Sequence, residues 1–201
     1  WLATAFGAEI VLDARLSEIV ADGNRVTAVR CERQGRAITR ACDGVVFTAE
    51  WIPETAALRG SGLMIDAQSG GPVIDQAMRT SLAGVFAAGN MLRPVESSGW
   101  AANEGRQAGH MAARYIGGRL SPVQGRTRLV AGAGLAYVVP QRWDAALAKD
   151  ETMPGLRPSL RAARDMTSAR LQLEQCGGAS QWIGPARSLR AHRRIELDLD
   201  R

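Results

Sequence analysis

The feature that most constrains the fold is the run of residues 80–90, Thr-Ser-Leu-Ala-Gly-Val-Phe-Ala-Ala-Gly-Asn, which is followed by a helical pattern after Ser98. Residues 85–88 form a short apolar stretch, Gly89 lets the backbone come close to another group, and Asn90 offers an amide. This order predicts a strand, a turn, a loop and a helix. In an open α/β sheet the binding crevice lies beyond the carboxyl ends of the strands, and the following helix presents unpaired amides. We therefore predict a ligand site at the corner formed by Gly89, Asn90 and the start of the helix at Ser98.

The helix is predicted over residues 98–116. Ser97 or Ser98 is the expected N-cap, and Gly117 with Gly118 supplies the stop. One predicted face carries mostly small residues, which would let the helix lie close to a sheet or a ligand. That face comprises Ala101, Gly105, Ala108, Ala112 and Ile116.

Residues 80–90 resemble the second flavin-binding motif of the two-dinucleotide-domain FAD oxidoreductases, the glutathione-reductase and thioredoxin-reductase type. Those enzymes usually end the motif in Asp, which accepts a hydrogen bond from a ribityl hydroxyl of FAD, and the carbonyl of Asn90 can keep that role without the charge. The next stretch, with Leu-Arg-Pro-Val-Glu, Gly-Trp and Glu-Gly-Arg, is similar to the FAD subunits of opine oxidase, hydrogen cyanide synthase and sarcosine-oxidase-like amine dehydrogenases. The resemblance covers residues 1–118 well and the remainder more loosely.

The resemblance implies FAD as cofactor and a set of residues that contact it. The expected cofactor-binding residues are Gly89, Asn90, Ser97, Ser98, Gly99 and Trp100. The first two would approach the ribityl and pyrophosphate part, and the rest the ring. Trp100 either stacks on flavin or substrate or packs between domains. Glu96 is expected to pair with Arg93, and no catalytic residue is assigned.

The resemblance implies an α/β fold class, a partial FAD/NAD(P)-binding Rossmann-like fold. Residues 1–52 would end an NAD(P)-type domain, with an antiparallel meander of strands at 16–21, 25–33 and 37–42 between buried strands at 9–12 and 43–48. Residues 53–120 would form the C-terminal part of an FAD-binding domain, with short strands at 63–65 and 73–74. Residues 121–201 predict a small β-rich C-terminal appendage with strands at 129–140, 168–175 and 195–199.

Composition limits the class of protein. With 46% hydrophobic and 22% charged residues, the chain has the balance of a soluble globular protein. Its apolar runs fall far short of the ~20 residues of a spanning helix, and no leader pattern is present, so no membrane span and a cytoplasmic location are expected. Cys31, Cys42 and Cys176 have no C-x-x-C spacing, so we expect reduced cysteines, no redox dithiol and no metal site. A bridge between Cys31 and Cys42 across a hairpin is an alternative.

The net charge of +5 arises entirely in residues 121–201, and the basic residues are Arg except for Lys149. No nucleic-acid module accompanies this charge, so nucleic-acid binding is not predicted. The basic residues near the end either form a surface for a partner subunit or a solvated face. They are Arg187, Arg190, Arg193 and Arg194.

The predicted function is that of the C-terminal portion of an FAD-dependent oxidoreductase acting on an amine or amino-acid-type small molecule, as one subunit of a hetero-oligomeric dehydrogenase. No G-x-G-x-x-G fingerprint occurs in the sequence. This leaves undecided whether the chain is an enzyme and whether it binds FAD alone. Two alternatives stay open: a non-catalytic remnant or subunit that docks to a partner, and an NAD(P)H-dependent flavin reductase without a redox dithiol.

Overall fold

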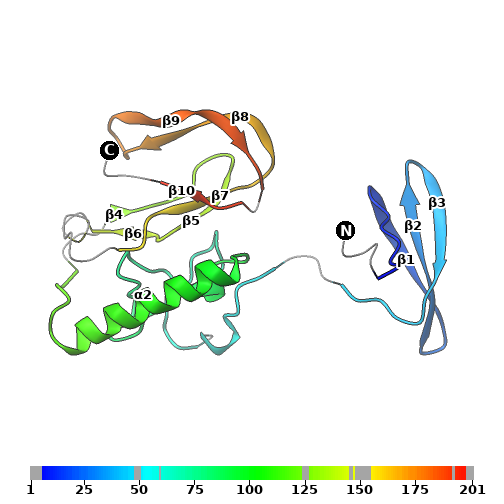
Figure 1. Ribbon diagram of the computed structural model, residues 1–201, viewed down its shortest axis with the longest axis horizontal. Coiled ribbons are helices and arrows are strands. Elements are labelled where there is room, and N and C mark those ends of the chain that lie inside the picture. The colour runs from blue at the N-terminus through cyan, green and yellow to red at the C-terminus, as the bar shows by residue number, and fades with distance from the viewer. Residues whose placement is uncertain are drawn as a thin grey trace. The chain divides into compact units, whose positions relative to one another are not determined.

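The computed structural model describes residues 6–47, 51–58, 60–123, 127–144, 147, 155–191 and 193–197. The chain divides into two compact units, Trp1–Ala49 and Glu50–Arg201. Each unit has its own secondary structure, which Figure 1 shows. Among the described residues, no helix is both long and apolar enough to cross a membrane.

The first unit is built on an antiparallel meander. Strands β1 (Ala14–Asp22), β2 (Arg25–Arg33) and β3 (Arg36–Ala41) pair in the order β1-β2-β3, which confirms the predicted meander. The two-residue turn between β2 and β3 needs left-handed backbone, and Gln34 and Gly35 adopt it with φ of 50° and 73°. In the register of this hairpin Cys31 lies opposite Ile38, and Cys31 and Cys42 are both free thiols.

The buried strands predicted at 9–12 and 43–48 are not formed over the residues that the structure describes there, 9–12 and 43–47. Most of their apolar side chains are exposed, at 61% for Ile10, 86% for Val46 and 70% for Phe47, and none is buried. A buried strand requires neighbours that satisfy its backbone N–H and C=O groups. The meander is the only sheet among the described residues of this unit, and neither segment pairs with it. Residue 48 lies outside the described residues.

The second unit contains most of the strands, all in antiparallel pairs. One sheet has the order β10-β7-β5, from β10 (Ile195–Glu196), β7 (Ser159–Ala162) and β5 (Leu135–Val139). Two further pairs are β4 (Thr127–Arg128) with β6 (Arg142–Trp143), and β8 (Met166–Glu174) with β9 (Ser180–Leu189). The predicted β-rich C-terminal part is therefore confirmed, although β4, β6, β7 and β9 were not predicted. Of the strand predicted at 129–140, only residues 135–139 are formed. Residues 198–199 of the last predicted strand lie outside the described residues.

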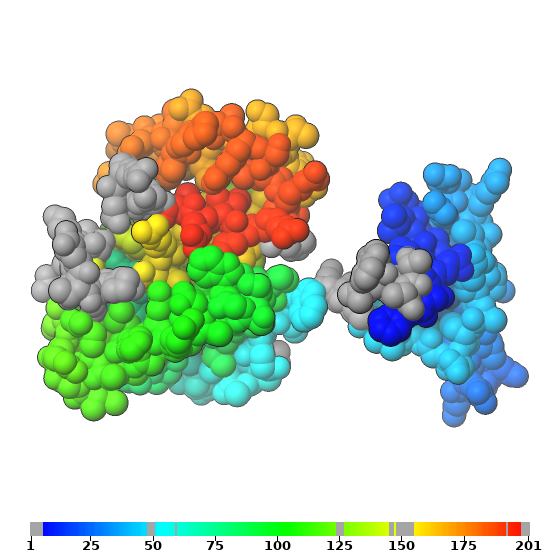
Figure 2. Space-filling view, viewed as in Figure 1, coloured from blue at the N-terminus to red at the C-terminus, as the bar shows by residue number. Residues whose placement is uncertain are grey.

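The layers of this unit are clear in Figures 1 and 2. The β8–β9 hairpin covers one side of the β10-β7-β5 sheet, and helix α2 (Ser98–Ile116) runs along the opposite side. An apolar cluster that includes Leu160, Leu189 and Ile195 lies between sheet and hairpin. A second cluster joins Leu92, close to the motif, to Val139 of β5. The C-terminal strands therefore share a core with the segment that carries the motif.

The segment before α2 has bridges in place of the predicted short strands. Phe86 makes a single bridge to Arg79, and Ile65 makes one to Pro72. The 3-10 helices η1 (Ala56–Leu58) and η2 (Gly89–Met91) are the other elements of this segment. The motif is therefore held mainly by turns and side-chain contacts.

Helix α2 has the predicted bounds, with Ser97 as N-cap and Gly117 as C-cap. The predicted small-residue face is partly wrong, because Gly105 and Ile116 are exposed while Glu104 and Met111 are the buried positions. The reason is that Glu104 turns inward to bond the motif, and this fixes the rotation of the helix about its axis.

Candidate functional site

The predicted corner is a tightly held loop. Gly89 starts η2 with a left-handed φ of 71° and is buried, and a Cβ placed on it would lie 3.5 Å from the Cβ of Ala101 in α2. On the other side Gly71 lies so close that a Cβ there would be 2.3 Å from the carbonyl oxygen of Leu92. Glycine is therefore required at Gly71 for space and at Gly89 for its backbone conformation. Asn90, the residue after Gly89, is exposed.

The start of α2 is also exposed. The Ser97 hydroxyl accepts a hydrogen bond from the Trp100 N–H at 3.4 Å, and Ser97, Ser98 and Gly99 are all open to solvent. The Trp100 ring is 39% exposed and carries the guanidinium of Arg194 at 4.1 Å from its centroid. One face of this indole is thus already occupied by a cation. The six predicted residues lie in η2 and at the amino end of α2, which contact each other, and their role toward a flavin stays a prediction.

Glu104 connects the motif loop, helix α2 and Arg194. Its Oε2 accepts a hydrogen bond from the Gly89 N–H at 3.1 Å, and its Oε1 is paired with Arg93 and lies 3.2 Å from Nη1 of Arg194. The side chains of Glu104 and Arg93 are almost completely buried. The Gly89 amide is therefore already used by a protein carboxylate, so Gly89 offers close approach and not a free donor.

Glu96 is the second carboxylate of the same network. It accepts from Nε of Arg93 at 3.2 Å, which confirms the predicted pair, and also from Arg161 and Arg194 at 2.8 Å each. Burial by itself raises the pKa of Glu96. The hydrogen bonds from the Ser97 amide and Arg194, with the charges of Arg93 and Arg161, outweigh burial and lower this pKa to about 2. Glu96 is therefore a charged structural group at neutral pH.

The network holds three guanidiniums and three carboxylates, because Nε of Arg194 also pairs with Oε1 of Glu196 at 3.1 Å. Among the described residues, Nη1 of Arg93 and Nε of Arg161 are buried and have no hydrogen-bond partner. The formal charges of the network therefore balance, and the amino end of α2 adds about half a positive charge beside it. The exposed start of the helix therefore favours an anionic group outside it.

Sequence reasoning missed Glu104, Arg161 and Arg194. The only signal was the Arg surplus after residue 120, which was interpreted as an exposed surface. Arg187, Arg190 and Arg193 are indeed exposed, and Arg190 pairs with Asp165 at 2.6 Å. Arg194 is only 9% exposed and belongs to the network, so its place in the predicted basic surface is wrong.

The described residues include no cluster of three or more His, Cys, Asp or Glu side chains that could hold a metal ion.

Comparison with known proteins then gives the family. Residues 2–117 match the sequence model of the family described as pyridine nucleotide-disulphide oxidoreductase. The chain belongs to this family.

Two curated relatives are the thioredoxin reductases of Listeria monocytogenes serovar 1/2a and Listeria innocua serovar 6a. Each is 32% identical over 114 residues, which cover 54% of this chain and 34% of the relative. The chain thus spans about a third of the length of the curated relatives it matches.

Among solved structures, the thioredoxin reductase of T. acidophilum is 29% identical, with a TM-score of 0.49, over 58% of this chain and 38% of that chain. The thioredoxin reductase of Lactococcus lactis is 23% identical, with a TM-score of 0.48, over 58% of this chain and 40% of that chain. The part of the chain that matches the pyridine nucleotide-disulphide oxidoreductase family, residues 2–117, includes the whole corner and helix α2.

Proposed function

We propose that the corner at Asn90 and the start of α2 form one side of an FAD site in an oxidoreductase. The observation that carries this proposal is the exposed start of α2 beside the exposed Asn90. Amides and positive charge at a helix start stabilise negative charge on a bound group. FAD, when bound, supplies the redox chemistry.

The residues of the chain fit such a group in three ways. Asn90 is exposed and its side-chain carbonyl can accept a hydrogen bond from a ribityl hydroxyl. Ser98 and Gly99, in the first turn of α2, present backbone N–H groups toward solvent. Glu104 holds Gly89 against the helix, so the loop keeps its shape whether or not a ligand is present.

For the reaction we propose oxidation of an amine or amino-acid-type substrate, with a partner subunit completing the enzyme. The sequence after Asn90, through Trp100, supports this choice by its resemblance to amine dehydrogenase subunits. The family match supports a second candidate, a pyridine-nucleotide-dependent reductase. Titrating flavin-loaded protein with NADH under anaerobic conditions distinguishes them, since bleaching of the flavin band by NADH favours the reductase, and bleaching only by an amine favours the dehydrogenase.

The test of the site itself is Asn90→Leu. FAD is titrated into the purified 201-residue protein, and the quenching of flavin fluorescence is followed. Loss of the amide leaves a flavin hydroxyl unpaired, so the affinity should fall about tenfold. Asn24→Leu makes the same change at an exposed position of the first unit and should leave the affinity unchanged. Equal affinities of the Asn90 variant and the wild type would remove the basis of the assignment.

The remaining alternative is a non-catalytic remnant that docks to a partner. The visible spectrum of the protein as purified decides it. A yellow flavin band supports the cofactor site, and a colourless protein that does not quench added FAD supports the remnant.

A further inference from the structure

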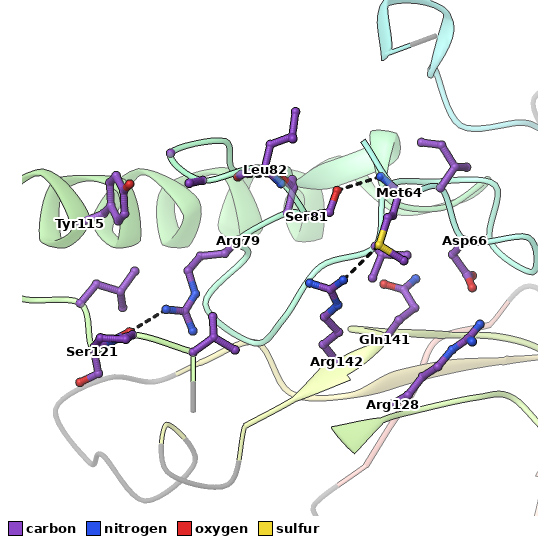
Figure 3. A pocket seen from close by; sticks show the side chains of 18 residues that line it. Met64, Asp66, Arg79, Ser81, Leu82, Tyr115, Ser121, Arg128, Gln141 and Arg142 are labelled. Atoms are coloured by element: carbon purple, nitrogen blue, oxygen red, sulfur yellow. Dashed lines mark hydrogen bonds between the residues drawn. The ribbon is translucent and has the colours of Figure 1, made fainter. Parts of the chain in front are cut away.

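A cavity lies at the carboxyl end of helix α2. It has a volume of about 840 Å³ and is lined by residues of the 64–84 segment, by the end of α2 and by strands β4 and β6 (Figure 3). Tyr115, in the last turn of α2, lines it, whereas Ser98 begins the helix at the flavin corner. At 1.5 Å per residue these ends are about 25 Å apart. None of the six predicted flavin residues lines the cavity, so it is a separate site.

The charged side chains that line this cavity are mostly basic. Its described lining has three guanidiniums, those of Arg79, Arg128 and Arg142, and one carboxylate, that of Asp66. Arg79 is also paired with Asp75 outside the cavity, at 2.6 Å. The carboxyl end of α2 adds the equivalent of about half a negative charge. The balance within and around the cavity is still positive after these negative groups are set against the guanidiniums.

The guanidiniums have donors to spare. Arg79 donates from Nε to Asp75 and from Nη1 to the carbonyl of Ser121 at 2.7 Å, while its Nη2 is buried without a hydrogen-bond partner among the described residues. Arg142 donates to the thioether sulfur of Met64 at 3.2 Å, as Figure 3 shows. A thioether is a weak acceptor, and no carboxylate among the described residues pairs with Arg142 or Arg128. These donors are suited to an oxyanion.

The rest of the lining is largely apolar. Leu82, Tyr115, Leu120 and Val123 contribute side chains to it, and Leu82 and Val123 are 36% and 47% exposed. An apolar ligand group that covers such surface gains about 25 cal/mol for each Å² removed from water. The lining therefore suits a ligand with an anionic end and an apolar body better than a fully hydrated anion.

We propose that this cavity binds a small organic acid. Its carboxylate would accept from the guanidiniums of Arg142 and Arg128, which are opposite each other in the register of β4 and β6. Its apolar body would lie against Leu82 and Leu120. At about 25 Å from the flavin corner the ligand takes no part in flavin chemistry. The site therefore stands independently of the function proposed above.

The test compares three probes by isothermal titration calorimetry with the 201-residue protein: 4-phenylbutyrate, its neutral amide and inorganic phosphate. The acid should bind at least about tenfold more tightly than the amide, because a charge-assisted hydrogen bond is about twice as strong as a neutral one. Arg142→Gln should lower the affinity for the acid about tenfold and leave the affinity for the amide unchanged. Arg142→Lys should keep part of the affinity. Arg36→Gln, on an exposed position of β3, is the matched control and should change nothing.

A second variant protects the test against a loss of folding. Arg128 is exposed on β4, so Arg128→Gln is expected to fold, and it should also weaken binding of the acid. The proposal is overturned if the acid does not bind, if the acid and the amide bind equally, or if phosphate competes as well as the acid. It is overturned as well if folded Arg142→Gln and Arg128→Gln proteins, verified by circular dichroism, bind the acid like the wild type.

Discussion

Glu104 is a buried carboxylate whose two oxygens contact three residues in two separate parts of the chain. It accepts from the Gly89 N–H and pairs with Arg93 and Arg194. A buried ion pair contributes little net stability, but removing one partner leaves the other charge uncompensated. Since Arg93 already has a buried nitrogen without a partner, the network has no spare acceptor for it among the described residues.

Glu104→Gln should therefore destabilise the protein strongly. The variant keeps an acceptor for Gly89 but removes the charge that faces Arg93 and Arg194, and the cost should be about 3 kcal/mol. Urea unfolding followed by tryptophan fluorescence measures it. Glu174→Gln, at an exposed position, is the control and should shift the unfolding free energy by less than about 0.5 kcal/mol. A change of similar size in both variants would show that the network does not depend on this charge.

Glu96 predicts a dependence of stability on acid pH. Its pKa falls from 4.5 to about 2 on folding, against the effect of burial and through Ser97, Arg194, Arg93 and Arg161. A carboxyl whose pKa is lowered by folding stabilises the native state above its unfolded pKa. That contribution, up to about 3 kcal/mol, is lost as the pH falls from about 4.5 to 2. Urea midpoints measured from pH 6 to 2 should fall less steeply in Glu96→Gln, and an identical slope would contradict the low pKa.

At the scale of elements, helix α2 depends on a modest cap. The hydroxyl of Ser97 accepts from the Trp100 N–H at 3.4 Å, which is a long bond at an exposed position. Ser97→Ala should therefore cost about 0.5 to 1 kcal/mol, at the low end for an N-cap, measured by thermal or urea unfolding. Ser97→Asp keeps an acceptor and places a negative charge at the helix start, so it should restore the stability. A loss in Ser97→Asp as large as in Ser97→Ala would argue against the cap.

The elements predicted well from the sequence are those with local causes. The bounds of α2 follow from Ser97 and from the glycines after Ile116, and the meander follows from alternation and turn residues. The rotation of α2 was not predictable, because it depends on contacts between Glu104 and segments elsewhere in the chain. Residues 9–12 have a strand pattern, but a sheet also needs a neighbour, which a local pattern does not reveal.

The candidate site shows the same division. Asn90 and Ser97 follow from a local motif, and the pair Arg93–Glu96 from their closeness in sequence. Arg161 and Arg194 reach Glu96 across 65 and 98 residues, and nothing local distinguishes them from the other arginines of that region. Long-range ion pairs of this kind follow no sequence period. The ion pairs of the corner could therefore be identified only from the structure.

At the scale of the whole molecule, the chain consists of two compact units. The apolar clusters of buried residues lie in Glu50–Arg201, and in one of them Leu92 and Val139 are completely buried. This shared core means that the β-rich C-terminal part supports the motif segment directly. The meander of the first unit depends on its own pairing.

Leu92→Ala should therefore weaken one unit and leave the other unchanged. Leu92 is 0% exposed, so the cavity created should cost the second unit about 2–5 kcal/mol. Hydrogen exchange followed by mass spectrometry should show faster exchange in β5 and in the 74–92 segment, with unchanged protection in β2. Val26→Ala, in β2, is the reciprocal variant and should speed exchange only in the meander. If either substitution accelerated exchange in both units equally, the chain would unfold as one cooperative block, and the corner would owe its stability to the meander as well as to the C-terminal strands.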